Sequence, residues 1–407
     1  MNIFFIGLAC TQEVIDESDE KYNNGISIVR PQQYFDLNLI KGLSKYARVK
    51  AISEPPVASY PNTRCLLYRN KKEILLDSIT IKYIGLINIF IIKTIIISIS
   101  IALNTLKFCL FNSRKDSAII LGHISFYKWL PVMIITKVLR FKTFLIVPDI
   151  PRYSDNYTET NSFVRRSLNK LLRRFNLISE KGFDGFVFLT EHMNKLINSS
   201  NKPYIVVEGF VNKNDIIVSK KECKYKKKIV MYAGTLHKKF GICNLVKAFL
   251  KIKCTDAELW IYGNGDFSEE LKEIAKMHSR IKYKGTRSRE EIFSIEKRVT
   301  LLVNPRPSDE EFTKYSFPSK TLEYMSSGTP LLTTMLPGIP IEYNKYLYTF
   351  ENESIESMSS KIETLLSLTD DELINFGKKA QSYVFENKSN IKQAEKIINM
   401  INSMFVM

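Results

Sequence analysis

The sequence predicts two doubly wound α/β domains joined by a short linker. Short apolar runs alternate with amphipathic helical stretches in both halves of the chain, which is typical of parallel sheets covered by helices on both faces. A polar, lysine-rich stretch without apolar periodicity, residues 213–228, interrupts this alternation. The length of 407 residues is enough for two domains, each with its own core.

The composition indicates a folded globular protein with an excess of basic residues. Hydrophobic residues make up 45% and charged residues 25%, which excludes a disordered or collagenous chain. The net charge of +17 favours a polyanionic partner such as anionic lipid or a phosphorylated ligand. Nucleic acid is not expected as a partner, because the sequence has no basic motif interleaved with aromatic residues and no groove-reading module.

The potential metal ligands and thiols are scattered along the chain. The 6 cysteines include no C-x-x-C pair and the 4 histidines form no ligand-spaced cluster, so we expect neither a zinc site nor a disulfide framework. Reduced thiols in a cytoplasmic protein are the default interpretation. No Asp-x-Asp pair is available to hold Mg²⁺ against a diphosphate, so we also expect metal-independent chemistry.

The first half contains the predicted elements of the first domain. Helices are predicted at 31–43, 129–139 and 191–198. Strands are predicted at 3–6, 49–52, 118–121, 143–147, 185–189 and 204–207.

Two stretches of the first half suggest contact with a membrane. Residues 83–103 are rich in isoleucine and long enough to span a bilayer, yet Lys82, Lys93, Ser100, Asn104 and Lys107 fall on one side of a helical wheel. A core or surface helix, a helix in the membrane interface and a true span are the three interpretations. A span would place strands of one sheet on opposite sides of the membrane, so we reject it. Residues 163–178 form a basic amphipathic pattern, and the chain is therefore predicted to bind the anionic inner face of the cell membrane peripherally, from the cytoplasm.

The second half repeats the alternation and ends in helical sequence. Strands are predicted at 229–232, 258–262, 281–283, 299–303 and 330–333, and helices at 244–251, 268–277, 289–296, 318–327 and 370–405. We therefore expect an N-terminal domain of residues 1–215, a linker of 216–228, a C-terminal domain of 229–385, and a final helix of 386–407 that packs back on the N-terminal domain.

Glycines and one arginine follow successive predicted strands of the second half. Because ligands of open parallel sheets bind beyond the carboxyl ends of the strands, these residues should line one site. They are Gly234, Gly263 with Gly265, Gly285, and Arg306.

The most informative motif is FPSKTLEYM at residues 317–325, followed by SGTP at 327–330. Pro318 suits the first turn of a helix and Ser319 a capping position, so the amides near Ser319, Lys320 and Thr321, together with the Lys320 ammonium, should bind an anion. A diphosphate is the natural occupant. Glu323, one turn further along, is placed to accept hydrogen bonds from a ribose diol.

These motifs, in order from Ala233 to about Glu342, resemble the nucleotide-sugar-dependent glycosyltransferases of the GT-B fold. The match is with glycosyltransferase family 4, in particular its members for capsular or lipopolysaccharide assembly. The resemblance implies two Rossmann-like domains facing a central cleft and a retaining transfer that uses no cofactor, the donor being a nucleotide-diphosphate sugar. It implies that Glu323 holds the ribose as the second glutamate of the family's Glu, seven residues, Glu motif. The Gly285, Thr286 and Arg287 loop would hold the base, and the Ser319 to Thr321 amides the diphosphate.

The sequence departs from the family pattern at three positions. The first glutamate of the motif, which contacts the donor sugar in relatives, falls on Tyr315, with Glu310 and Glu311 as possible substitutes. The family's Arg and Lys after the first strand become Thr235 and Phe240, so Lys238, Lys239, Arg306 and Lys320 must supply the positive charge.

The N-terminal domain offers His123 and Asp149, which follow predicted strands, as residues of the acceptor side. The function predicted from all these features is transfer of a sugar from a nucleotide-diphosphate donor to a lipid-linked or growing glycan in cell-surface polysaccharide synthesis. The alternatives are a nucleotide-sugar epimerase of the same fold and a non-catalytic, membrane-associated assembly subunit.

Overall fold

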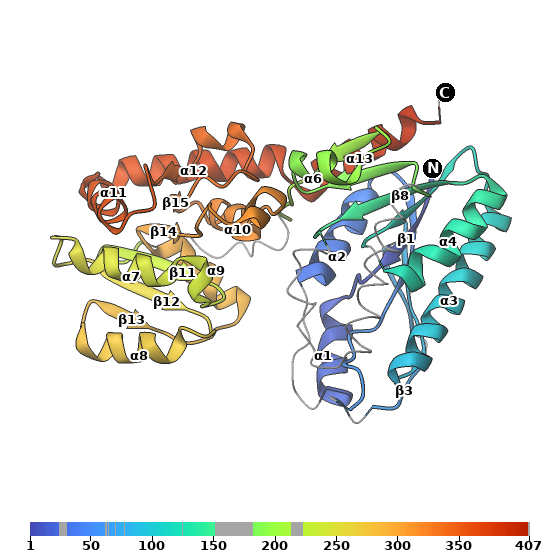
Figure 1. The fold of residues 1–407 in the computed structure, drawn as a ribbon, viewed down its shortest axis with the longest axis horizontal. Coiled ribbons are helices and arrows are strands. Elements are labelled where there is room, and N and C mark those ends of the chain that lie inside the picture. Colours follow the sequence, from blue (N-terminus) through green and yellow to red (C-terminus); the bar gives the residue numbers. More distant parts are fainter. Residues whose placement is uncertain are drawn as a thin grey trace. The chain divides into compact units, whose positions relative to one another are not determined.

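The structure, a computed structural model, describes residues 1–23, 31–61, 63, 65–69, 71–76, 78–123, 125–150, 182–212 and 223–405. The chain divides into two units, Met1–Gly209 with Asn390–Met407, and Phe210–Ser389 (Figure 1). The boundary between the first and the second unit thus falls after Gly209, a few residues before the boundary expected at 215. Residues 216–222 of the predicted linker and the basic stretch 163–178 lie outside the described residues.

The first unit is built on an 8-stranded sheet in the order β10-β9-β8-β7-β1-β2-β5-β4. Neighbouring strands are parallel except for β4, which pairs antiparallel with β5. The strands are β1 (Asn2–Gly7), β2 (Arg48–Ser53), β4 (Lys71–Leu76), β5 (Ile79–Tyr83), β7 (Ser117–Leu121), β8 (Lys142–Val147), β9 (Gly185–Phe188) and β10 (Tyr204–Val206). The β4–β5 hairpin was not predicted from the sequence.

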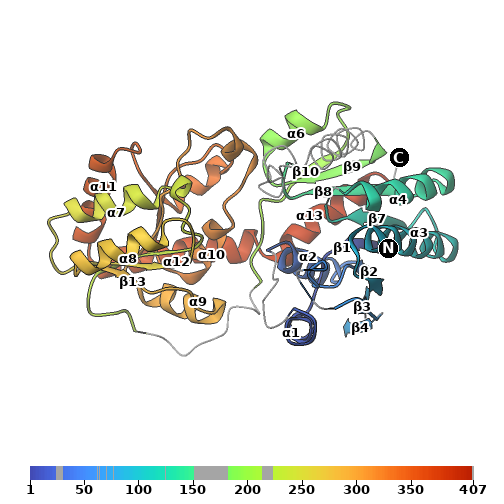
Figure 2. The ribbon, with the colours of Figure 1, turned by 60° about the horizontal axis from the view of Figure 1, so that its bottom comes forward.

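Helices cover both faces of this sheet, with α1 and α2 on one face and α3 and α4 on the other (Figures 1 and 2). The helices are α1 (Gln12–Lys21), α2 (Pro31–Leu43), α3 (Phe90–Phe111), α4 (Phe126–Leu139), α6 (Glu191–Ile197) and α13 (Asn390–Ser403). Helix α1 is not predicted from the sequence, because its residues, QEVIDESDEK, are mostly acidic and polar.

The isoleucine-rich segment differs from the predicted helix over 83–103. Lys82 and Tyr83 belong to β5, and a short strand β6 (Leu86–Ile87) pairs antiparallel with β3 (Leu67–Tyr68) before α3 begins at Phe90. β-Branched isoleucine suits strands as well as helices, so the prediction from composition placed the start of the helix too early.

The C-terminal helical stretch is two helices rather than one. Helix α12 (Asp370–Asn387) ends before Lys388 and Ser389, and α13 then packs against α2 of the first unit. The approach is close at Gly42, where an added Cβ would lie 2.3 Å from the backbone oxygen of Asn390. The side-chain amide of Asn390 donates a hydrogen bond to the backbone oxygen of Asn38 (3.1 Å).

The second unit is a 6-stranded parallel sheet in the order β13-β12-β11-β14-β15-β16. Its strands are β11 (Ile229–Ala233), β12 (Glu258–Tyr262), β13 (Ile281–Tyr283), β14 (Leu301–Asn304), β15 (Leu331–Thr333) and β16 (Tyr348–Thr349). Its other helices are α7 (Ile242–Lys251), α8 (Ser268–Met277), α9 (Arg289–Arg298), α10 (Ser319–Ser327) and α11 (Ile355–Ser367).

The central strand β11 explains why this sheet is buried on both faces. Val230 and Tyr232 point into one apolar core, while Ile229, Met231 and Ala233 point into the other. Alternate residues of a strand face opposite sides, so a continuous apolar strand requires helices on both. The predicted fold class, two Rossmann-like α/β domains, is confirmed.

Candidate active site

Glycines close the carboxyl ends of β11, β12 and β13 in a tightly packed layer. The Gly234 amide donates to the backbone oxygen of Tyr262 (3.0 Å), and the Gly263 amide to that of Gly285 (2.9 Å). At Gly263, φ is +126° and a Cβ would stand 1.7 Å from the backbone oxygen of Gly234; at Gly265 it would stand 2.5 Å from Leu236. Neighbouring backbone therefore demands both glycines. Gly285, at φ +66°, faces open space and needs glycine only for its backbone conformation.

Lys320 lies over the first of these strand ends. A Cβ on Gly234 would lie 2.4 Å from Cε of Lys320, so the lysine stem occupies the space that a larger residue would take. Helix α10 starts at Ser319, and Pro318 is its N-cap residue with extended backbone (φ −68°, ψ 110°). The prediction that Ser319 is a capping residue is thus wrong by one position. Pro318 makes no side-chain cap hydrogen bond, and Thr321 is buried.

A tyrosine fastens α10 to the end of β11. The hydroxyl of the fully buried Tyr324 accepts a hydrogen bond from the Ala233 amide (2.9 Å) and donates one to the Ala233 carbonyl (3.0 Å). Its ring centroid is 5.6 Å from Nζ of Lys320. Each helix residue has a fixed direction relative to Tyr324, so this contact sets the position of Lys320 and Glu323 relative to the glycine layer.

A buried glutamate that sequence reasoning missed lies beside this helix. Glu296 of α9 is fully buried, and among the described residues neither of its carboxylate oxygens has a hydrogen-bond partner. Burial raises the pKa of Glu296 well above its usual value, and the negative charge of Glu323 raises it further, against the opposing charges of Lys320 and Arg289. In the sequence, Glu296 stands in the polar run REEIFSIEKR, where no pattern distinguishes a buried glutamate from its solvated neighbours.

Arg306 follows β14 and stacks against two aromatic rings. Its guanidinium carbon lies 4.7 Å from the ring centroid of Phe312 and 5.2 Å from that of Phe240. Phe240 stands where the family has lysine, so the aromatic ring here supports an arginine that comes from another strand end. Such stacking holds the planar charge in place.

The other predicted donor-side residues lie on the periphery of this arrangement. Tyr315 ends the 3₁₀ turn Glu311–Tyr315 and is half-buried, while Glu310 and Glu311 are exposed. Lys238 pairs with Glu270 (2.6 Å) on the surface, so it is already neutralised. The remaining exposed residues are Thr235, Lys239, Thr286 and Arg287.

In the first unit, His123 belongs to a buried charged network. Lys128 of α4 is buried and forms an ion pair with Glu54, the residue after β2. Its ammonium also lies 2.8 Å from Nε2 of His123, which follows β7, and the Tyr127 hydroxyl donates to Oε1 of Glu54 (3.2 Å). Burial alone would raise the pKa of Glu54, but the Lys128 ammonium outweighs it and lowers that pKa. Asp149 is exposed, two residues past the end of β8.

Asp36 lies beneath the carboxyl ends of β1 and β7. Its Oδ2 accepts the Leu8 amide (2.7 Å), and a Cβ on Gly7 or Gly122 would approach the same oxygen to 2.4 or 2.9 Å. Burial raises the pKa of Asp36 to about 7. No sequence pattern singles out this residue, since it stands inside an amphipathic helix.

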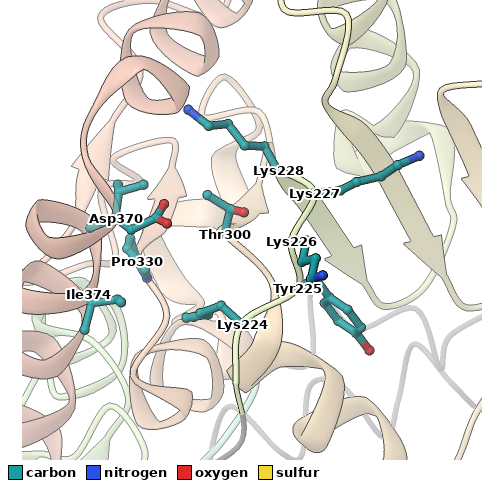
Figure 3. A pocket seen from close by; sticks show the side chains of 10 residues that line it. Lys224, Tyr225, Lys226, Lys227, Lys228, Thr300, Pro330, Asp370 and Ile374 are labelled. Carbon is teal, nitrogen blue, oxygen red and sulfur yellow. The ribbon is translucent and has the colours of Figure 1, made fainter.

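A pocket in the second unit lies at the opposite edge of its sheet. It is lined by residues that precede β11, β14 and β15, including Lys224, Thr300 and Pro330 (Figure 3). The Lys224 ammonium donates to the Val299 carbonyl and to Oγ1 of Thr329, both at 2.7 Å, and burial lowers its pKa to about 8. This lysine supports the fold at the amino ends of the strands, away from Gly234 and Lys320.

Within the ranges that the structure describes, no group of three or more His, Cys, Asp or Glu residues is arranged to hold a metal ion. Lys320 and Arg306 instead bring positive charge to the carboxyl ends of β11 and β14. The arrangement can thus hold an anion electrostatically, next to a carboxylate at Glu323.

Comparison with known proteins agrees with this geometry. Residues 227–368 match the family described as glycosyl transferases group 1. Sucrose-phosphate synthase from Thermosynechococcus elongatus, 12% identical, superposes with a TM-score of 0.65 over 100% of this chain and 99% of its own. The lipopolysaccharide outer core galactosyltransferase WaaB, 14% identical, superposes with a TM-score of 0.62 over 99% of this chain and 100% of its own.

TarM from S. aureus, solved in complex with fondaparinux, α-GlcNAc-glycerol and UDP, is 19% identical with a TM-score of 0.55. The match covers 78% of this chain and 60% of TarM, so this chain spans well under two thirds of TarM's length. No curated protein matches the sequence significantly. The fold shared with these structures is GT-B. The family match to residues 227–368 agrees with the resemblance that the motifs of the second half indicate.

Proposed function

We propose that the protein transfers a sugar from a uridine-diphosphate donor to a lipid-linked or growing glycan in cell-surface polysaccharide synthesis, with retention at the anomeric carbon. The observation that carries the proposal is the placement of Lys320 over Gly234, at the start of a helix without a side-chain cap. Backbone amides and an ammonium group converge there, as a diphosphate requires.

The chemistry proposed for this site is electrostatic. When the bond between the sugar and the diphosphate breaks, negative charge accumulates on the leaving diphosphate. Lys320 and the amides at the start of α10 stabilise that charge where it develops. Arg306 is the second cation that we assign to the leaving diphosphate. Glu323, half-buried one turn into α10, accepts hydrogen bonds from the ribose hydroxyls.

The choice of uridine follows from TarM, whose solved complex contains UDP. The choice of acceptor follows from WaaB, a lipopolysaccharide core galactosyltransferase, and from the basic excess of this chain, which suits an anionic membrane. The proposed place of action is the cytoplasmic face of the cell membrane.

The test begins with thermal unfolding of the purified protein in the presence of UDP, GDP, ADP and TDP. Binding to the native state raises the unfolding temperature, so we expect UDP to stabilise the protein most. Stabilisation by none of the nucleotides would contradict the proposal and favour a non-catalytic assembly subunit. The second step incubates UDP-glucose, UDP-galactose and UDP-GlcNAc with and without a membrane extract that carries lipid-linked glycans. Interconversion of the donors without extract would indicate an epimerase, whereas incorporation of label into the lipid fraction is expected.

A further inference from the structure

The outward side of helix α3 is apolar along its whole length. Ile91, Leu103 and Leu110 are 68, 62 and 66% exposed. Exposed isoleucines and leucines between them continue the same side at helical spacing: Ile92, Ile95, Ile99 and Leu106. A soluble surface helix normally turns its polar side outward, so this orientation is reversed.

Two polar residues of α3, Lys93 and Asn104, are half-buried and bond to the protein instead, whereas Lys107 is exposed. The Lys93 ammonium donates to the Val57 carbonyl (3.2 Å), and the Lys82 ammonium of β5 donates to Oδ1 of Asn104 (3.2 Å). Ile97 and Ile101 are buried in the core of the first unit. The polar stripe recognised in the sequence is therefore real on Lys93 and Asn104, but it is an internal stripe.

Residues Ile91–Phe111 are long and apolar enough to cross a membrane by length and composition. The contacts of α3 with β1, β6 and α4 argue against a crossing, because a helix in the bilayer would leave the sheet it covers. Its polar side chains would also lose the partners that they have in the fold. The helix is therefore a covering helix of the sheet whose outer side needs another explanation.

Neighbouring segments extend the apolar surface beyond α3. Helix α4 lies alongside α3 in both views and contributes Ile134 and Val138, which are 59 and 74% exposed (Figures 1 and 2). Before the start of α3, the β3–β6 pair adds a cluster of exposed apolar residues: Leu66, Leu67, Ile87 and Ile89. We call this combined surface the α3/α4 face.

The charge on this surface is mainly positive, and the exposed Asp116 just beyond α3 is paired with the N-terminal ammonium (3.2 Å). Neither α3 nor α4 contains an acidic residue. Exposed basic residues lie at the carboxyl ends of the two helices and just beyond them: Lys107, Arg114, Lys115, Lys137 and Arg140. Lys137 has Asp184 3.8 Å away, an ion pair at the limit of contact. A second copy of the chain would bring these like charges together on its own face, whereas an anionic surface would pair with them.

We propose that the α3/α4 face lies in the headgroup region of a bilayer that contains anionic lipid, with α3 and α4 parallel to the membrane plane. The isoleucines and leucines enter the upper acyl region, and the basic side chains reach the lipid phosphates. Large exposed apolar patches in soluble folds mark interaction sites, and this one combines exposed apolar side chains with positive charge.

This position has a consequence for the acceptor, which rests on the proposed function. Helix α3 begins after β5 and β6 and ends before β7, so it runs against the strands and starts at the carboxyl edge of the sheet. Glu54 and His123 lie at that same edge, after β2 and β7. A lipid-linked glycan whose tail is inserted beside the start of α3 would therefore present its headgroup to these residues.

Flotation with vesicles of phosphatidylcholine, alone or mixed with phosphatidylglycerol, tests the membrane surface without donor or acceptor. We expect the wild type to float with the anionic vesicles, and less so at high salt. The double variant Ile99→Ser/Leu103→Ser should lose at least tenfold in vesicle affinity. The matched control is Met277→Ser/Ile341→Ser, which removes two apolar side chains of the second unit that are more exposed (70 and 82%) than Ile99 and Leu103 (54 and 62%) and should bind as the wild type does.

Several results would overturn the proposal: wild type that does not float, an Ile99/Leu103 variant that floats normally, or a control variant that loses binding equally. Wild type that forms a dimer in solution, lost in the Ile99/Leu103 variant, and that shows no vesicle binding would assign the face to a second copy instead. UDP-dependent thermal stabilisation is measured on each variant, which shows that the variant is folded. It also separates failure of the membrane surface from failure of the donor site.

Discussion

Lys320 passes so close over Gly234 that a single added carbon on the glycine would collide with Cε of the lysine, at 2.4 Å. The pair joins the start of α10 to the end of β11, the two features that a phosphate group at a strand end would contact. The absence of a side chain at one residue is thus what allows the charge of the other to sit at the sheet edge.

We expect Lys320→Met to weaken UDP binding by about ten- to a hundredfold, because a hydrogen bond to a charged group contributes about 1.5 to 3 kcal/mol. Isothermal titration calorimetry measures the change directly. Lys345→Met, which removes an exposed lysine of the same unit, is the matched control and should leave the affinity unchanged. Equal affinities of the Lys320 variant and the wild type would remove Lys320 from the site.

Three glycine-to-alanine changes should differ sharply in their effect on unfolding. Gly263→Ala should destabilise most, because its Cβ would meet the Gly234 carbonyl oxygen at 1.7 Å in a backbone conformation that disfavours side chains. Gly285→Ala, with open space around it at φ +66°, should cost only about 1 to 2 kcal/mol. Gly234→Ala should fold with some loss of stability, since the flexible end of Lys320 is able to move away but the Tyr232 hydroxyl, 2.9 Å from the added Cβ, must shift as well. The variant should bind UDP more weakly.

Urea denaturation of the three variants provides the comparison. A Gly285 variant less stable than the Gly263 variant would contradict the close packing of the glycine layer. A Gly234 variant with wild-type UDP affinity would show that the position of Lys320 over the strand end is not needed for binding.

The positions of most strands along the chain, and the motifs that follow them, could be read from the sequence because each depends on local pattern. Val230 to Ala233 is a short apolar run followed by glycine, and Pro318 marks a helix start within one residue. The start of α3 could not be read, since isoleucines suit both β-strands and helices. The burial of Glu296 and Lys128 depends on which elements pack together, and no local pattern distinguishes them from solvated charges.

The outward direction of the apolar side of α3 could not be read for the same reason. The helical wheel correctly separates a polar side containing Lys93 and Asn104 from an apolar one. It does not say which side meets the sheet. The partners of those two residues, Val57 and Lys82, and the burial of Ile97 and Ile101 decide this.

Glu296→Gln should make the protein more stable than the wild type, and this difference in the free energy of unfolding should grow as pH rises. The folded-state pKa of Glu296 is raised, so its contribution to stability is present below the unfolded-state value near 4.5 and is lost as pH increases toward the folded-state value. Glutamine has nearly the same shape and no proton to lose. The variant should match the wild type near pH 4 and exceed it at pH 8.

Urea midpoints at pH 4, 6 and 8 measure this difference. Glu290→Gln, an exposed change in the same helix, is the control and should follow the pH dependence of the wild type. A Glu296 variant whose stability relative to the wild type does not change with pH would mean that Glu296 has no raised pKa in the folded protein.

The buried ion pair between Lys128 and Glu54 should behave as a unit. Lys128→Met leaves the Glu54 carboxylate largely buried without its counter-charge, and Glu54→Gln removes the carboxylate that pairs with the ammonium, so each single change should cost about 3 to 5 kcal/mol. The double variant leaves no uncompensated charge and should recover much of that loss. Because the two residues are in contact, their effects should be non-additive by at least about 1 kcal/mol in a double-mutant cycle of urea unfolding. Additive single effects would mean that Glu54 and Lys128 are stabilised separately, and the network that holds His123 at the end of β7 would then have to be built from other contacts.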